Sequence, residues 1–254
     1  MASDRYSQYD TFAWFYNRHW GGFAERIMPV LERLVLPALP DGARLLDLCC
    51  GTGQLARILT VHGYRVTGID GSEEMLRYAR MNAPGASFVV ADARSFVLPA
   101  EYRAAVSLFD SLNHVMGLDE LRAVFSNVYA ALVPGGTFLF DLTVEDGYRA
   151  RWRGSFGIAE DDNACVVRNR YDPDTKVGRS DITMFRPGAQ ARGWRRSDLT
   201  LLHHCHAEDA VRAALEGVRF REIRAFDVLT DLNMPDAAAW AAGRVFFLSR
   251  RPEK

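Results

Sequence analysis

From residue 44 onward, short apolar runs alternate with segments of helical periodicity, and this alternation constrains the fold more than any other feature of the chain. The first five segments are predicted as strand, helix, strand, helix and strand, over residues 44–49, 54–62, 65–70, 72–82 and 87–91. Strands that alternate with helices build βαβ units, whose strands run parallel. The sequence therefore predicts an α/β fold, a Rossmann-like, doubly wound and mostly parallel seven-stranded sheet.

The same patterns predict further elements on both sides of these segments. They are a helix that contains Phe23, Ile27, Val30, Leu31 and Leu34, a strand over 104–109, a helix over 119–132, a strand over 137–142, a helix over 208–216 and strands over 218–227 and 244–250. Pro134, Gly135 and Gly136 are expected to form the turn before the 137–142 strand.

Residues 145–204 break the alternation, because helical periodicity disappears there. Extended runs over 165–171 and 177–185 flank the turn-like residues 172–175, which predicts an antiparallel β insertion after the fifth strand. Such an insertion would lie over the carboxyl edge of the sheet, where ligands bind in doubly wound folds. The expected parts are a helical cap and ligand-binding core over 1–144, a lid over 145–204 and the completion of the core over 205–254.

Composition excludes several classes of protein. With 254 residues, of which 48% are hydrophobic and 25% charged, the chain can bury one substantial core. Its apolar runs are far shorter than the roughly 20 residues of a membrane helix, and residues 4–8 show no secretory signal, so we expect a cytoplasmic protein. A formal net charge of −1 provides no basic field for nucleic acid. The cysteines at 49, 50, 165 and 205 are expected to be reduced thiols.

A glycine turn after the first strand of the sheet indicates a ligand site. Gly51 and Gly53 lack a Cβ, so a ligand can approach this backbone closely. With Ala56 they also match the GxGxxA dinucleotide fingerprint, for which Asp70 is an acceptable ribose partner, so an NAD-dependent oxidoreductase is one hypothesis. Asp47 inside the strand favours another ligand, since its carboxylate would attract a cationic amino-acid group and repel a pyrophosphate. S-adenosylmethionine carries such a cationic group.

Residues 47–53 resemble the first motif of the class I methyltransferases, with Cys49 in place of the usual first glycine, and the resemblance extends over nearly the whole chain. Residues 132–136 resemble the family's loop before the fifth strand, and residues 92–94 its adenine motif. Individually, Asp70 and an acid at 92 could simply cap turns. The resemblance implies S-adenosylmethionine as cofactor and these cofactor-binding residues: Asp47, Cys49, Gly51, Gly53, Asp70, Met75, Asp92, Ala93, Phe109, Tyr9 and Tyr16.

Residues 109–114 follow the fourth strand, which in class I methyltransferases ends beside the reactive methyl group. His114 could accept a proton or a hydrogen bond from the acceptor, because the unperturbed pKa of histidine is about 6.5; a turn-capping histidine is the alternative. This segment and residues 9–17 resemble the amino-sugar N,N-dimethyltransferases. That resemblance implies that Tyr9 and Tyr16 close over the site, with Tyr16 and His114 as the catalytic candidates. A buried aromatic stripe is the alternative for the two tyrosines.

Three other groups of polar residues have both functional and ordinary interpretations. Asp141 could pair with a cationic substrate or cap a turn. Residues 203–206, three histidines and a cysteine, suggest zinc, but alternate residues of a strand face opposite ways, so no metal site is expected. The insertion carries ten arginines among nine acids, which is typical of a solvated surface, although one arginine could bind an acidic substrate.

Together these features predict an S-adenosylmethionine-dependent methyltransferase that transfers a methyl group to nitrogen or oxygen of a small molecule by in-line displacement. An NAD-dependent oxidoreductase and a noncatalytic S-adenosylmethionine-binding module are the alternatives. The expected partner is a small-molecule acceptor, with neither nucleic acid nor membrane, and a homodimer stays open.

Overall fold

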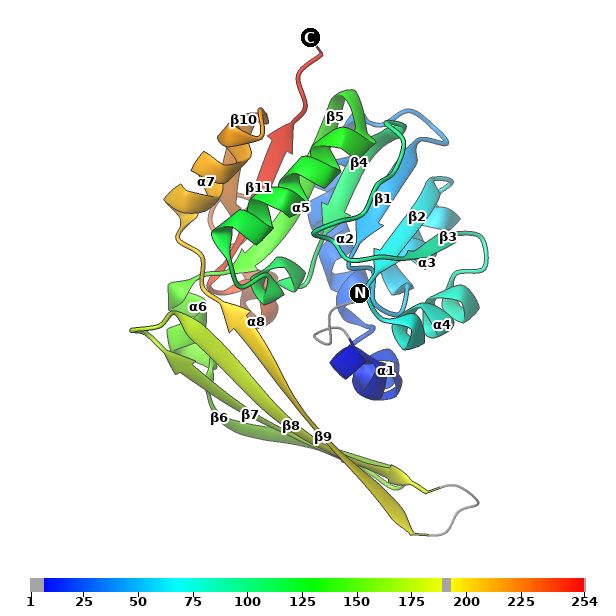
Figure 1. Ribbon diagram of the computed structural model, residues 1–254, viewed down its shortest axis with the longest axis vertical. Coiled ribbons are helices and arrows are strands. Elements are labelled where there is room, and N and C mark those ends of the chain that lie inside the picture. Colours follow the sequence, from blue (N-terminus) through cyan, green and yellow to red (C-terminus); the bar gives the residue numbers. More distant parts are fainter. Residues whose placement is uncertain (1–6, 189–192, 254) are drawn as a thin grey trace.

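The computed structural model describes residues 7–188 and 193–253, which fold around two β-sheets (Figure 1). The larger sheet has seven strands in the order β10-β11-β5-β4-β1-β2-β3. Its strands are β1 Arg44–Leu48, β2 Arg65–Asp70, β3 Ser87–Val90, β4 Tyr102–Ser107, β5 Leu132–Thr143, β10 Arg221–Asp227 and β11 Arg244–Arg250. Neighbouring strands are parallel except in the two pairs that β11 makes. The predicted mostly parallel α/β sheet is therefore confirmed.

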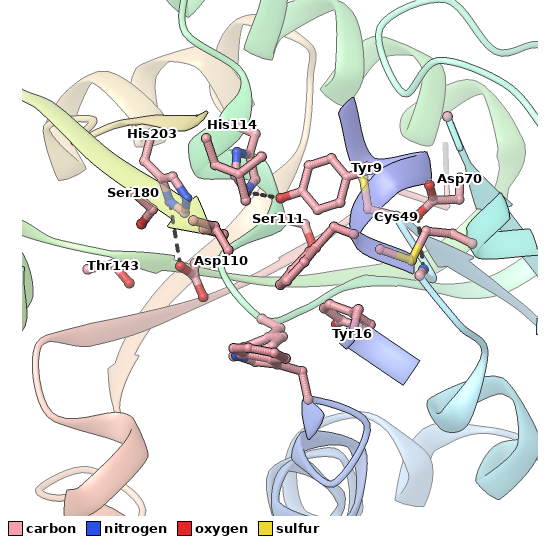
Figure 2. Close-up of a pocket in the computed structure, with 18 of the residues that line it drawn as sticks. Tyr9, Tyr16, Cys49, Asp70, Asp110, Ser111, His114, Thr143, Ser180 and His203 are labelled. Carbon is pink, nitrogen blue, oxygen red and sulfur yellow. Dashed lines mark hydrogen bonds and ion pairs between the residues drawn. The ribbon is translucent and has the colours of Figure 1, made fainter. Parts of the chain in front are cut away.

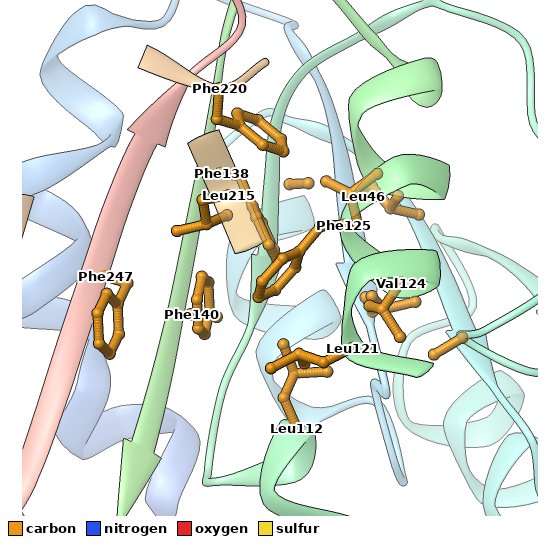
Figure 3. Packing of buried hydrophobic residues seen from close by; sticks show 14 of the residues in the cluster. Leu46, Leu112, Leu121, Val124, Phe125, Phe138, Phe140, Leu215, Phe220 and Phe247 are labelled. Atoms are coloured by element: carbon orange, nitrogen blue, oxygen red, sulfur yellow. The ribbon is translucent and has the colours of Figure 1, made fainter. Parts of the chain in front are cut away.

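Helices cover both faces of this sheet (Figure 1). On one face, α5 and α7 pack against alternate residues of the central strands, and Figure 3 shows Phe125 of α5 beside Phe138 and Phe140 of β5. On the other face, α2, α3 and α8 bury a second apolar cluster. The helices are α1 Ser7–His19, α2 Phe23–Leu34, α3 Gln54–Val61, α4 Glu73–Asn82, α5 Leu118–Ala131, α6 Glu145–Arg151, α7 Glu208–Gly217 and α8 Ala238–Ala241.

The second sheet is inserted after β5, as predicted, and its four strands are antiparallel. They are β6 Arg153–Glu160, β7 Asn163–Asp172, β8 Val177–Pro187 and β9 Trp194–His204. In Figure 1 this sheet extends away from the larger one and passes α1. Its apolar face packs on Phe12 and Phe15 of α1 through Cys165, Ile182 and other side chains. One surface of the insertion therefore contacts the N-terminal helix, while the other carries exposed ion pairs.

Several element boundaries differ from the predictions. Helix α6 lies at the start of the insertion, where no helix was expected; seven residues make about two turns, too few to give a clear periodic signal. Strand β5 already begins at Leu132 and contains the expected turn, with Gly135 at a φ of +76°. Strand β4 ends at Ser107 instead of 109, and β10 begins at Arg221 instead of 218. Residues 111–114 form a short 3-10 helix, η2.

Two expectations concern a secretory signal and a membrane-spanning helix. Residues 4–6, part of the segment on which the expected lack of a secretory signal rests, lie outside the described residues. Within the described ranges, no helix combines the length and the apolar character needed to cross a membrane.

Asn113 joins the insertion to the larger sheet. Its side chain is fully buried, and its amide oxygen accepts a hydrogen bond from the Thr143 backbone N–H at 2.9 Å. Its amide nitrogen donates to the carbonyl oxygens of Thr143 and His204, at 3.1 and 2.9 Å. One side chain therefore holds η2, the end of β5 and the end of β9 together.

Replacement of Asn113 by alanine should destabilise the protein strongly, because three backbone groups lose a hydrogen-bond partner at a buried position. We expect Asn113→Ala to lower the free energy of unfolding by about 2–4 kcal/mol, as measured by urea denaturation. Ser126→Ala, on an exposed position of α5, is the control and should change it by less than about 0.5 kcal/mol. Equal stability of the two variants would contradict this role for Asn113.

Candidate active site

A cavity of about 410 Å³ lies where β1, β2 and β4 end, between α1 and the four-stranded sheet (Figure 2). Nine of the residues predicted for the site line it, namely Tyr9, Tyr16, Cys49, Gly51, Asp70, Met75, Ala93, Phe109 and His114. Asp47, Gly53 and Asp92 do not. In Figure 2, Cys49 and Asp70 lie at one end of the cavity, and Ser180, His203 and Asp110 lie at the other. We call these the carboxylate end and the histidine end.

The glycine turn brings the backbone between β1 and α3 close to the cavity. Cys49, Gly51 and Gly53 all have positive φ angles, of 59°, 54° and 78°. A Cβ on Gly51 would lie 3.2 Å from the ring of Tyr16, so the absence of a side chain there lets α1 pack against the turn. A Cβ on Gly53 would clash with the Ala79 backbone at 2.8 Å. Gly53 is therefore required for the packing of α3 on α4. This packing role is separate from the cofactor contact that the sequence predicted for Gly53.

Two acids lie at the carboxylate end, the buried Asp47 and the partly buried Asp70. The carboxylate of Asp70 accepts hydrogen bonds from the backbone N–H groups of Gly51 and Ser72, both at 2.9 Å, and burial raises its pKa to about 6. Asp47 is only 3% exposed, and its Oδ2 has no hydrogen-bond partner within the described part of the chain. Burial, and then the nearby charge of Asp70, raise the pKa of Asp47 to about 8.

Asp47 lines a small hollow of about 40 Å³ that shares Tyr16, Cys49 and Phe109 with the main cavity. A buried carboxylate oxygen without a partner is costly, and a cationic hydrogen-bond donor would satisfy it. The chemistry of this hollow therefore fits the ammonium group of an amino-acid moiety, which is the group for which the sequence predicted Asp47.

Asp92 is held by an ion pair within the protein. Its carboxylate accepts hydrogen bonds from Nε and Nη2 of Arg94, the latter at 2.6 Å, and Arg94 also contacts Glu120. The neighbouring residues Ala91 and Ala93 line the cavity. The sequence did not predict the pair of Arg94 with Glu120, because only the folded chain brings Glu120 of α5 to Arg94. The adenine contact of Asp92 stays a prediction.

At the histidine end, Tyr9 and His114 form a hydrogen-bonded pair. The Tyr9 hydroxyl lies 2.6 Å from Nε2 of His114, and Nδ1 of His114 lies 2.9 Å from the carbonyl oxygen of Leu202. A carbonyl only accepts, so Nδ1 carries the proton and Nε2 accepts from the tyrosine hydroxyl. Burial lowers the pKa of His114, which keeps the ring neutral near pH 7.

Helix α1 forms a wall of the cavity and is fixed by polar contacts. Tyr9, Phe12 and Tyr16 line the cavity from this helix, and Trp20 lines it from the turn that follows. Asp10 accepts hydrogen bonds from the Ser72 hydroxyl and the Glu74 backbone at the start of α4. Burial raises the pKa of Tyr16 far above the usual value, so its phenol stays protonated. The aromatic stripe predicted on this helix is thus both packed and part of the cavity.

Arg244 is one of the cavity residues that the sequence did not predict. Its guanidinium pairs with Asp110, at 2.7 Å, and with Asp141, and all three side chains are largely or fully buried. The backbone N–H of Asp110 also donates to Asp141, at 3.0 Å. Asp141 therefore pairs with a cation of the protein itself, and capping of a turn is not its role. An arginine directly before the apolar run 245–248 was the available signal.

The histidines at 203–206 separate in the fold. His203 lines the cavity, with its ring centroid 3.9 Å from that of His114, and its Nδ1 lies 3.7 Å from Asp110. His206 does not line the cavity, and its Nε2 donates a hydrogen bond to the carbonyl oxygen of Val115 at 2.7 Å. Within the described residues, no group of three His, Cys, Asp or Glu side chains is arranged to hold a metal ion.

Comparison with known sequences identifies the family. A family model described as a methyltransferase domain matches residues 45–136. The trans-aconitate 2-methyltransferase of Streptomyces avermitilis is 32% identical over 250 residues, covering 89% of this chain and 84% of that protein. The dTDP-3-amino-3,4,6-trideoxy-alpha-D-glucopyranose N,N-dimethyltransferase of Streptomyces venezuelae is 28% identical over 222 residues, covering 84% and 91%. The match to Bacillus subtilis YqeM, 37% identical, spans about half of each chain, 48% and 47%.

Solved structures share the fold. The crystal structure of Streptomyces venezuelae DesVI has a TM-score of 0.74 at 22% identity, covering 94% of this chain and 96% of that one. CalS10, an amino pentose methyltransferase from Micromonospora echinaspora solved with S-adenosylmethionine, has a TM-score of 0.68 at 24% identity, covering 95% and 96%. These findings confirm the predicted family and the resemblance to amino-sugar N,N-dimethyltransferases, and they favour S-adenosylmethionine over NAD. The chain belongs to the class I methyltransferases and is an enzyme that uses S-adenosylmethionine as its methyl donor.

Proposed function

We propose that the enzyme methylates nitrogen or oxygen of a small molecule that binds at the histidine end of the cavity. The observation that carries this proposal is one continuous cavity that joins Asp70 to the Tyr9 and His114 pair. The names of two relatives support it, since one acts on trans-aconitate and the other on a dTDP-linked amino sugar, both small molecules. A cavity of about 410 Å³ is within the usual range for small-molecule sites.

In this proposal the carboxylate end holds the cofactor. S-adenosylmethionine supplies a methyl group on a positively charged sulfur. Asp47 would bind its ammonium group, because the carboxylate oxygen there lacks a partner. Asp70 is already oriented by two backbone N–H groups and would accept hydrogen bonds from the ribose hydroxyls. The remaining cofactor contacts are proposed for Cys49, Gly51, Met75, Ala93, Phe109, Tyr9 and Tyr16, which all line the cavity.

At the histidine end, the residues of the chain prepare the acceptor. An in-line displacement needs an acceptor atom with a free lone pair, held in line with the methyl group. The neutral His114 ring can take up a proton at Nε2, and Tyr9 can pass it on, because its hydroxyl already donates to that nitrogen. Tyr16 is protonated and so would donate a hydrogen bond instead of acting as a base.

The insertion over 145–204 is proposed to act as a lid. Its side chains Trp152, Phe156, Ile182 and Leu201 line the cavity opposite the larger sheet, and α1 closes the remaining side. Exclusion of water strengthens electrostatic interactions in the site. The proposal further includes a cytoplasmic location, in line with four cysteines that are free thiols. The proposed partner is a small-molecule acceptor rather than nucleic acid or membrane, and self-association as a homodimer stays open.

Replacement of Asp47 by asparagine should weaken cofactor binding, because the neutral amide loses the charge that balances an ammonium group. We expect Asp47→Asn to bind S-adenosylhomocysteine about tenfold to a hundredfold more weakly, as measured by isothermal titration calorimetry. Asp41→Asn, at an exposed position, is the control and should bind as the wild type does. Equal affinity of Asp47→Asn and wild type would remove Asp47 from the cofactor site.

Cofactor binding should release a proton near pH 7. The pKa of Asp47 is about 8 in the free protein, so the carboxyl group is mainly protonated there. A bound ammonium stabilises the ionised form and lowers this pKa, and the proton must leave. Titration with S-adenosylhomocysteine at pH 7 in buffers of different ionisation enthalpy should therefore show release of up to about one proton in the wild type. The same release in Asp47→Asn would assign the proton to another group.

The Tyr9 and His114 pair should affect catalysis more than cofactor binding. Because the pair faces the acceptor, we expect Tyr9→Phe and His114→Gln to lower kcat about tenfold or more. The affinity for S-adenosylhomocysteine should change less than about threefold. Transfer of a radiolabelled methyl group to the first acceptor found in a screen measures kcat, with Tyr64→Phe as a control remote from the cavity. Wild-type kcat in both variants would exclude proton transfer by the pair.

A further inference from the structure

Arg151 is a cation of the cavity wall that has no acidic partner. Four side chains that carry a formal charge line the cavity: Asp70, Asp110, Arg151 and Arg244. Asp70 lies at the carboxylate end, and Arg244 forms ion pairs with both Asp110 and Asp141. Within residues 7–188 and 193–253, Arg151 has no carboxylate oxygen within 4.0 Å, in contrast to its neighbour Arg149, which pairs with Glu145 at 2.6 Å.

The position of Arg151 makes this lack of a partner significant. It is the last residue of α6 and is partly buried, and Nη1 donates to the carbonyl oxygen of Trp240 at 3.0 Å. That bond orients the guanidinium, and no carboxylate oxygen of the described residues lies within ion-pair distance of it. Burial, and then repulsion by Arg244, lower the pKa of Arg151, whereas the charges of Asp110 and Asp141 act in the opposite sense. An anion bound beside the guanidinium would therefore be stabilised by a charge that the protein leaves unpaired.

Other groups around the same end of the cavity also favour an anion over a cation. Asp110 already pairs with Arg244, at 2.7 Å, so an ammonium group of a substrate would have to compete with that guanidinium for it. The Ser180 hydroxyl donates to Oδ1 of Asn169 at 2.6 Å, which leaves the amide N–H groups of Asn169 as donors on the cavity wall. Arginine with its fork of N–H groups, next to such donors, is typical of carboxylate and phosphate binding.

We propose that the methyl acceptor carries an anionic group, a carboxylate or a phosphate, and that Arg151 binds it and so determines acceptor specificity. This inference rests on the proposed function, since it identifies the substrate class of the same cavity. Arg151 takes no part in bond making or breaking. Its role is to hold the anionic end of the acceptor, which lies away from the methyl group. This contact keeps the reacting atom in position in the cavity.

The test is a titration of the protein saturated with S-adenosylhomocysteine. Two probes, propane-1,2,3-tricarboxylate and inorganic pyrophosphate, are added at constant ionic strength to wild type, Arg151→Gln, Arg151→Lys and Arg149→Gln. We expect saturable binding of at least one probe by the wild type and about tenfold weaker binding by Arg151→Gln, with Arg151→Lys in between. Arg149→Gln, which loses only an exposed ion pair, should bind as the wild type does. The probe that binds identifies the anion as carboxylate or phosphate.

A second measurement uses the wild type alone, in case Arg151→Gln unfolds. Arginines are modified with phenylglyoxal and located by mass spectrometry, with and without the bound probe. The anion should protect Arg151 and leave Arg149 reactive. Absence of saturable anion binding, a loss smaller than tenfold in a folded Arg151→Gln protein, or no protection of Arg151 would overturn the inference. Binding of S-adenosylhomocysteine itself is measured first, so that a failure of the proposed function is recognised separately.

Discussion

The buried ion cluster of Arg244, Asp110 and Asp141 determines the geometry of the cavity. It joins the first residue of β11 to β5 and to the segment that follows β4. In that segment Phe109 and Asp110 both have positive φ angles, 65° and 48°, which typically cost about 1 kcal/mol or more each for residues other than glycine. The ion pairs and the Asp110 N–H bond to Asp141 offset this strain. The short helix η2 follows directly and places Nδ1 of His114 within hydrogen-bond distance of the Leu202 carbonyl oxygen.

The two ends of the cavity differ in the charge that they leave unsatisfied. At the carboxylate end, Asp47 has a buried oxygen without a hydrogen-bond partner among the described residues. Burial disfavours its ionised form and raises its pKa. At the histidine end, Asp110 and Asp141 both contact Arg244, whereas the guanidinium of Arg151 contacts no carboxylate of the described residues. A cationic methyl donor and an anionic acceptor would each meet a complementary group. Between them lie Tyr9 and His114, neutral groups that can move a proton without adding a net charge.

The sequence predicted the parts of the fold and of the site that depend on local patterns. The alternating segments predicted the parallel sheet, and the ends of its first two strands predicted Asp47 and Asp70 as residues of one site. Arg244 could not be predicted, because its place depends on the antiparallel register between β11 and β5. The sequence suggested that one arginine of the insertion could bind an acidic substrate, but it could not single out Arg151, whose place depends on the short helix α6. Likewise, the contact of Tyr9 with His114 spans 105 residues and requires the whole fold.

The most direct test of this account is a crystal structure of the enzyme with S-adenosylhomocysteine. The account predicts that the amino group of the ligand lies within hydrogen-bond distance of Oδ2 of Asp47, and that the ribose hydroxyls contact Asp70. It also predicts open space beyond the sulfur, toward His114 and Arg151, for the acceptor. A ligand bound elsewhere, or a bound ligand that leaves Oδ2 of Asp47 without a partner, would contradict the assignment of that carboxylate to the cofactor.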